Sequence, residues 1–212
     1  MNTTHSVKFH LVIAGLGLAL LLADCATTPK GERYVVAPLG TTFTSSSTST
    51  GSYGSGTTET ITKITERMWE GKKVTAFVSS SGVLLASSEG WMAILAPDDK
   101  PIFTWDPPIG PDFPLEVGKT WTKSYRVTAH AVKQTVPFDS AWKIDAYEDV
   151  TLPAGTFKAF KMSYSDTLGN EQIFWYMPEL GFIGKRMDKR TAKYRTGPGT
   201  RDSEVISYTI AK

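Results

Sequence analysis

The sequence has few of the residues from which catalytic and metal sites are usually built. Cysteine occurs once in 212 residues and histidine three times, with His5 and His10 close to the start. One cysteine excludes an internal disulfide and any site held by several thiolates. His130 is the only histidine left after the first ten residues. The composition therefore offers no candidate for a catalytic residue, a metal site or a cofactor.

A charge excess of one sign is also missing. Lys and Arg number 23 and Asp and Glu 21, so the formal net charge is +2 at pH 7. Proteins that bind nucleic acid through its phosphates need a basic excess, and no nucleic-acid partner is expected. The length allows one domain with a substantial buried core.

The one long hydrophobic run lies at the N-terminus and is too short to cross a bilayer. It extends from Leu11 to Ala23, behind Lys8. A helix of this length rises about 20 Å, whereas the hydrocarbon core is roughly 30 Å thick. A short apolar run behind a cationic start is typical of a signal peptide.

The single cysteine stands at the end of this run, in Leu22-Ala23-Asp24-Cys25. These residues resemble the lipobox of bacterial lipoproteins, which implies that Cys25 is acylated and becomes the first mature residue. Asp24 departs from the pattern, because the residue before the cysteine is normally small. The alternative is ordinary cleavage of the signal peptide, which would leave a soluble periplasmic protein without a lipid. The resemblance also implies that Ala26 directs the protein of a Gram-negative cell to the outer membrane, facing the periplasm.

These features divide the chain into three parts. Residues 1–24 are interpreted as the signal peptide, 25–37 as a lipidated tether and 38–212 as a single β-domain. A weak internal repeat indicates two possible halves, 38–105 and 114–212. In this repeat Pro38–Thr44 resembles Pro114–Thr122, and Lys63-Ile64 parallels Lys143-Ile144.

Alternation of apolar and polar residues dominates the chain after residue 61. It is strict from Trp142 to Ala146, and Phe160, Met162 and Tyr164 alternate in the same way with polar neighbours. This period of two belongs to half-buried antiparallel strands. Turn residues such as Pro153-Ala154-Gly155 separate the strands. The pattern predicts an all-β fold, an antiparallel barrel or half-barrel that could consist of two related β-meanders.

Two segments need a separate interpretation. Residues 41–60 are mostly Thr, Ser and Gly, a composition typical of linkers but also of exposed strands. We favour two weakly specified strands joined by a hairpin loop at Gly51, Gly54 and Gly56. The proline-rich stretch Asp106–Pro114 is expected outside the central strands, since proline cannot donate to a β-ladder.

The second half carries a recognisable pair of motifs. Val150–Lys158 contains P-A-G-T-F, and Trp175–Lys185 contains W-Y-x-P-E-x-G. Together with Pro114–Trp121 they resemble uncharacterised secreted or lipoprotein β-domains of bacteria, over roughly residues 114–190. The resemblance implies an antiparallel barrel-like fold and no activity. Gly184 before the final lysine departs from that pattern, which usually has a branched residue there. The proline and glycine residues themselves predict tight hairpins.

No set of catalytic side chains can be assembled. His130 is placed on the polar face of a strand, without the G-x-S-x-G motif that would accompany a serine nucleophile. Two pairs of adjacent carboxylates occur, Asp98/Asp99 in a predicted turn and Glu148/Asp149 near the end of a strand. Glycosidase chemistry requires carboxyl groups that face one another across a cleft, which neither pair indicates. The protein is therefore not expected to be an enzyme.

Two features are candidates for binding. The six tryptophans fall about one per predicted strand, and either fill the core or line a cavity for a lipid or other apolar ligand. The ligand candidates among them are Trp121, Trp142 and Trp175. A basic stretch from Lys185 to Arg201 holds seven cations against one acid. Its candidates for contact with an anionic surface are Lys185, Arg186, Lys189 and Arg190, although a solvated hairpin would carry the same pattern.

The sequence favours an outer-membrane lipoprotein, held to the membrane by its N-terminal lipid, with a structural, assembly or protein-interaction role. The alternative is a carrier or receptor for a lipid or hydrophobic ligand of the cell envelope, an analogy at the level of the fold. An open cavity lined by tryptophans would favour the carrier. A filled interior with an exposed patch would favour the interaction module.

Overall fold

The protein is an all-β barrel in a computed structural model that describes residues 31 and 33–212. The described part contains twelve strands and one short 3-10 helix, η1 (His130–Val132). The strands are β1 Thr42–Gly51, β2 Gly56–Trp69, β3 Lys72–Ser79, β4 Gly82–Ser87, β5 Gly90–Leu95, β6 Pro101–Ile109, β7 Thr120–Ala129, β8 Gln134–Leu152, β9 Gly155–Asp166, β10 Asn170–Met177, β11 Phe182–Arg190 and β12 Gly199–Thr209. The all-β prediction is confirmed.

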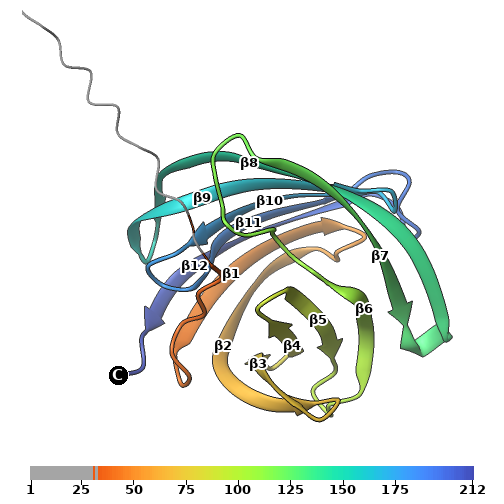
Figure 1. The fold of residues 1–212 in the computed structure, drawn as a ribbon, viewed down its shortest axis with the longest axis horizontal. Helices are drawn as coiled ribbons and strands as arrows, with labels where there is room; N and C mark the ends of the chain where they lie inside the picture. The colour runs from red at the N-terminus through yellow and green to blue at the C-terminus, as the bar shows by residue number, and fades with distance from the viewer. Residues whose placement is uncertain (1–30, 32) are drawn as a thin grey trace, which may run out of the picture.

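Each strand pairs antiparallel with its neighbours in the chain, and β1 pairs with β12 to close the ring (Figure 1). This pairing extends from Thr42 opposite Thr209 to Gly51 opposite Gly199. Of the two predicted forms the chain adopts the closed barrel, not the half-barrel. A closed barrel leaves no strand edge free. With its own core and no open edge, the described part has the properties of a segment that folds on its own.

The Thr/Ser-rich segment forms β1 and β2 and so confirms the prediction of strands over a linker. Gly51 has φ 61° and Gly54 φ 91°, backbone conformations that glycine adopts without a steric penalty. Hydroxyl groups join β1 to β12, with 2.7 Å between the Oγ atoms of Ser47 and Ser203. The seam that closes the barrel is therefore held by small polar side chains as well as by the backbone.

The proline-rich stretch was expected outside the strands, and this prediction is wrong for its first residues. Asp106 to Ile109 belong to β6. The β6–β7 pairing, however, ends at Asp106, and the β5–β6 register is irregular between Trp91 and Ala93. Pro107 and Pro108 thus lie where the ladder is interrupted, a position that tolerates a residue without an N–H.

The starts of the two predicted halves share a local geometry. The amide of Gly40, before β1, donates to the carbonyl of Ile64 at 2.7 Å, and that of Gly118, before β7, donates to the carbonyl of Ile144 at 2.8 Å. Both isoleucines are fully buried. The repeat noted in the sequence thus has the same hydrogen bond at both places. Two separable halves stay a prediction, because the strands form a single ring.

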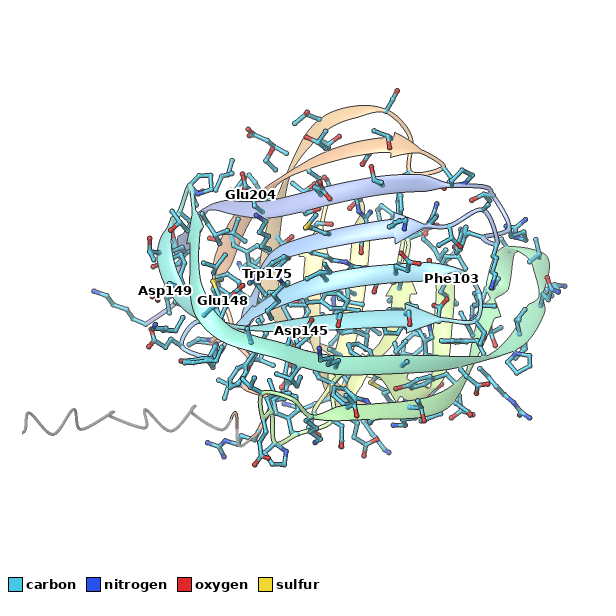
Figure 2. The ribbon with its side chains drawn as sticks, turned by 90° about the horizontal axis from the view of Figure 1, so that it is seen from above. Phe103, Asp145, Glu148, Asp149, Trp175 and Glu204 are labelled. Carbon is cyan, nitrogen blue, oxygen red and sulfur yellow. The ribbon has the colours of Figure 1, made fainter. Side chains whose placement is uncertain are left out.

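The up-and-down order gives the barrel two ends. We call one the terminal end, because β1 begins and β12 ends there, together with the β8–β9 and β10–β11 turns. The other, the distal end, carries the β1–β2, β9–β10 and β11–β12 loops. Figure 2 shows Glu148 and Asp149 at the terminal end and Phe103 toward the distal end. In the described ranges no helix has the length and apolar character needed to span a membrane.

The residues before β1 pack against the terminal end. Gly31 and Leu115 exchange two backbone hydrogen bonds, and the Tyr176 hydroxyl bonds to the backbone of Val35. Ala37 is buried, with its amide donating to the carbonyl of Gly181 at 3.3 Å. The described part of segment 25–37 is therefore in contact with the barrel, and the chain enters the domain at its terminal end.

Candidate functional site

The interior of the barrel holds a cavity of about 580 Å³. Its lining residues come from all twelve strands, as expected for a space enclosed by the ring. Opposite residues in an antiparallel pair share a face, and the register places Arg186 of β11 between Phe174 of β10 and Ser203 of β12. Because all twelve strands contribute to its wall, the cavity depends on closure of the barrel and not on one particular loop.

Aromatic rings form much of the cavity wall. Trp91 of β5 and Trp105 of β6 line it. Phenylalanines line it too: Phe103 of β6, and Phe43, Phe77, Phe138 and Phe182 from four other strands. Trp91 reaches Phe174 across the barrel, with 5.8 Å between ring centroids and an edge-to-face angle of 69°. Such a wall is chemically suited to an apolar molecule.

One buried carboxylate organises the charged side chains within the barrel. Asp188 of β11 has a side chain with no exposed surface, and it accepts hydrogen bonds from Arg186 and Arg201. Arg201 donates both Nε (3.1 Å) and a terminal nitrogen (2.9 Å) to the same oxygen. A buried charge is tolerated when it is paired and hydrogen-bonded, and Asp188 meets that condition twice over.

A third guanidinium, that of Arg190, lies beside this group. It is sandwiched between two tyrosine rings, 3.8 Å from the centroid of Tyr53 and 4.3 Å from that of Tyr194. Its terminal nitrogen donates to the carbonyl of Ser52 at 2.8 Å. The Tyr53 ring also faces Arg201 at 4.8 Å. Cation–π contacts of this kind hold guanidinium groups in fixed orientations.

Asp166, at the end of β9, is a carboxylate that lines the cavity. It accepts hydrogen bonds from the Tyr164 hydroxyl at 2.6 Å and from the backbone and side-chain nitrogens of Asn170. Burial raises the pKa of Tyr164 far above its usual value, and the negative charge of Asp166 raises it further. Tyr164 is therefore a neutral hydrogen-bond donor to Asp166.

The three tryptophans singled out from the sequence do not lie together. Trp121 and Trp142 are opposite one another on β7 and β8 and their rings stack, 5.6 Å apart at 7°. They belong to the core cluster beside the cavity and do not line it. The register places Trp175 on the other face of the sheet, where Lys161 and Lys185 each approach its ring to 5.4 Å. Figure 2 shows Trp175 near Glu148, which accepts its indole hydrogen bond at 2.9 Å.

The basic stretch is likewise split by the pleat of β11. Arg186 and Arg190 point into the barrel and line the cavity. Lys185 and Lys189 alternate with them: Lys185 borders the cavity and approaches the Trp175 ring, and Lys189 pairs with Glu171 at the surface, at 2.7 Å. Lys189 therefore lies apart from the other three cations, and contact with an anionic surface stays a prediction.

Several other candidate residues can be placed. His130 lies in η1 instead of on a strand, and its ring bonds to the Thr104 hydroxyl at 3.0 Å. Asp98 pairs with Lys100 and Asp149 with Lys158, both at the exposed surface. Among residues 31 and 33–212 no group of three or more His, Cys, Asp or Glu side chains could hold a metal ion. Cys25, with its neighbours Asp24 and Ala26, lies outside the described residues.

Sequence reasoning named Arg186 and Arg190, but for contact with an anionic surface and not for a cavity. It counted Asp188 and Arg201 only as members of the basic stretch, and it did not single out Trp91 and Trp105 from the six tryptophans. One signal was available: Arg186, Asp188 and Arg190 recur at every second position, which puts them on one face of a strand. That this face is the inner one depends on closure of the ring.

No family model matches this sequence, and no curated protein matches it. Some solved structures show a partial likeness. A Bacteroides fragilis protein described as having a YmcC-like fold gives a TM-score of 0.43 at 12% identity, covering 84% of this chain and 99% of its own. The hypothetical lipoprotein YmcC from Escherichia coli gives 0.45 at 10% identity, covering 78% of this chain and 84% of its own. A protein from Parabacteroides distasonis gives 0.43 at 8% identity, with 84% and 99% covered.

Proposed function

We propose that this protein is a lipid-anchored envelope protein whose barrel binds a hydrophobic molecule. The observation that carries the proposal is the interior cavity of about 580 Å³ with aromatic side chains in its wall. Ligand sites in proteins typically measure about 300–1,000 Å³ and combine apolar walls with a few polar groups. Larger β-barrels use such interiors for ligands, whereas small ones are filled by side chains.

Anchoring follows from the sequence around Cys25. Several acyl chains on one residue would hold the domain at a bilayer, since each buried CH₂ contributes about 0.8 kcal/mol. The chain reaches the barrel at its terminal end, so the anchor would attach there and the distal end would point away. We expect globomycin to cause accumulation of the precursor and Cys25→Ala to release the protein from membranes. Normal processing in the presence of globomycin, together with a Cys25→Ala variant that stays on membranes, would contradict the lipid anchor.

Ligand binding can be tested on residues 26–212 without detergent. We expect native mass spectrometry to show bound envelope lipid after incubation with a lipid extract. Thr60 lines the cavity, and Thr60→Phe should reduce binding by filling part of the space. Circular dichroism and thermal unfolding control for the fold of the variant. A wild-type domain that stays free of lipid under these conditions would contradict the carrier.

A structural or protein-interaction role is the second candidate, and a groove on the outer face favours it. This groove crosses β8 to β12, with a volume of about 580 Å³, and its lining includes Ala141, Ile173 and the exposed Met187. A photo-crosslinker placed at Met187 would capture a specific envelope protein if this role is correct. Absence of any reproducible adduct in cells, with normal expression, would contradict it.

A further inference from the structure

The charged end of the cavity has more positive than negative charge. Arg186, Arg190 and Arg201 line it, and among the described residues Asp188 is the single carboxylate that pairs with any of them. Both carboxylate oxygens of Asp188 are taken up by Arg186 and Arg201. Within the described part of the chain, Arg190 has no carboxylate at ion-pair distance.

The nearby acids do not offset this excess. Asp166 is occupied by the Tyr164 hydroxyl and by Asn170. Glu204 also lines the cavity, but it lies directly opposite Lys185, a further cation of the lining. Charges removed from bulk water interact strongly and are costly when left uncompensated. The interior therefore has an electrostatic preference for a negatively charged group.

Arg190 is the side chain best placed to receive that group. Its Nε is buried and meets no hydrogen-bond acceptor among the described residues. The two tyrosine rings and the carbonyl of Ser52 hold the guanidinium in place. A fixed guanidinium with unused donors is the arrangement that recognises carboxylate and phosphate.

The rest of the cavity is more apolar and extends along the barrel from Arg190, with the Arg186 guanidinium 5.5 Å from the Trp91 ring centroid. Arg190 and Arg201 lie beside the β1–β2 and β11–β12 loops at the distal end, whereas Tyr34, next to Tyr176, is at the terminal end. The wall between them includes Trp91 and Trp105. One ligand with a charged head and an apolar body would match both parts.

We propose that the barrel binds an amphipathic anion, with its carboxylate or phosphate head on Arg190 and its hydrocarbon chain along the aromatic wall. This inference rests on the proposed function that the barrel takes up a hydrophobic molecule. It assigns the ligand class and its direction: the head lies at the distal end, away from the site where the chain enters the barrel.

The test compares ligands that differ only in the head group. Residues 26–212 are titrated with sodium laurate, dodecyl phosphate and 1-dodecanol, each followed by displacement of the neutral fluorescent probe N-phenyl-1-naphthylamine. We expect the two anions to bind about tenfold or more tightly than the alcohol, since hydrogen bonds to charged groups are among the strong ones. Arg190→Gln should remove most of this preference and leave dodecanol binding unchanged. Inorganic phosphate and acetate, which have no chain, should not displace the probe.

Lys189→Gln is the matched control, because it removes one positive charge from the adjacent position on the outer face. Equal loss of anion affinity in Lys189→Gln and Arg190→Gln would overturn the assignment of the head group. Equal affinity for laurate and dodecanol in the wild type would also overturn it, while leaving the proposed function intact. Failure of the probe and of all three chains to bind would overturn the proposed function itself. Displacement by inorganic phosphate as effective as by dodecyl phosphate would exclude an amphipathic ligand.

Discussion

The two faces of β11 carry the same kind of side chain in opposite environments. On the outer face, Lys185 covers the Trp175 ring and Lys189 forms an exposed ion pair with Glu171. On the inner face, Arg186 shares the buried Asp188 with Arg201. Lys189 keeps much of its contact with water, whereas Arg186 has exchanged most of its own for protein partners. The face of β11 on which a cation lies therefore decides its partners and its contribution to stability. Membership of a basic stretch in the sequence does not.

The strongest test of this difference is to remove the inner carboxylate. Asp188→Asn should lower the free energy of unfolding by about 3–5 kcal/mol, because the fully buried carboxylate loses its charge and two partly buried guanidinium groups lose their counter-charge. Urea denaturation of residues 26–212 measures the change. The outer counterpart is Glu171→Gln, expected to change stability by no more than about 0.5 kcal/mol. Similar losses of unfolding free energy in Asp188→Asn and Glu171→Gln would show that the two faces of the sheet do not differ in burial.

A second comparison uses adjacent apolar residues on β10. Phe174 is buried at 1% exposure and packs against Trp91 and Trp142, while Ile173 belongs to the outer groove. Phe174→Ala should cost about 3 kcal/mol or more through lost packing and the resulting cavity. Ile173→Ala should cost clearly less. Thermal unfolding of the two variants orders them, and the reverse order would contradict the inner position of Phe174.

The pH dependence of stability gives a third test of the interior. The pKa of Tyr164 is raised by burial and by Asp166, so the folded state keeps a proton that the unfolded state loses above about pH 10. The stabilising contribution is complete below that pH and is lost as the pH rises toward the folded-state pKa. We expect the free energy of unfolding to fall above pH 10, by up to about 1.4 kcal/mol per pH unit from this group. Tyr164→Phe should make the fall shallower, and an unchanged slope would contradict the assignment.

The smallest effect is expected at the outer ion pair itself. Lys189→Ala should change the free energy of unfolding by about 0.5 kcal/mol or less, since both partners are about half exposed. The difference from wild type should shrink further in 1 M salt, where the screening length is only about 3 Å. Urea denaturation at low and high salt provides the measurement. A large loss that is insensitive to salt would mean that Lys189 is not a surface residue.

Local features of the fold were accessible from the sequence. Pro153-Ala154-Gly155 predicted a tight turn that joins β8 to β9, and the threonine-rich segment predicted the β1–β2 hairpin. The proline-rich stretch was misplaced because β6 accommodates Pro107 where its ladder is interrupted. The place of Pro107 in β6 depends on how β5 and β7 pair with it, and the residues around Pro107 in the sequence carry no information on that pairing.

The site was much less accessible. Trp121, Trp142 and Trp175 were candidates because the tryptophans fall about one per predicted strand, but this spacing does not say which face of a strand encloses a cavity. The structure puts Trp142 in the core and Trp175 on the other face, and leaves Trp91 and Trp105 to line the interior. Arg201 reaches Asp188 because β11 and β12 pair, and Tyr53 reaches both Arg190 and Arg201 from the far end of the chain.

The sequence by itself determined the all-β character of the fold and several of its turns, because period-two alternation and turn residues are local properties of the backbone. It also confined cysteine to one position before the domain, which makes Cys25 the candidate for a lipid anchor. Only the tertiary structure decided that β1 and β12 close the ring. Closure turns one face of every strand inward, and this enclosure separates Arg186 and Arg190, which line the cavity, from Lys189 at the surface.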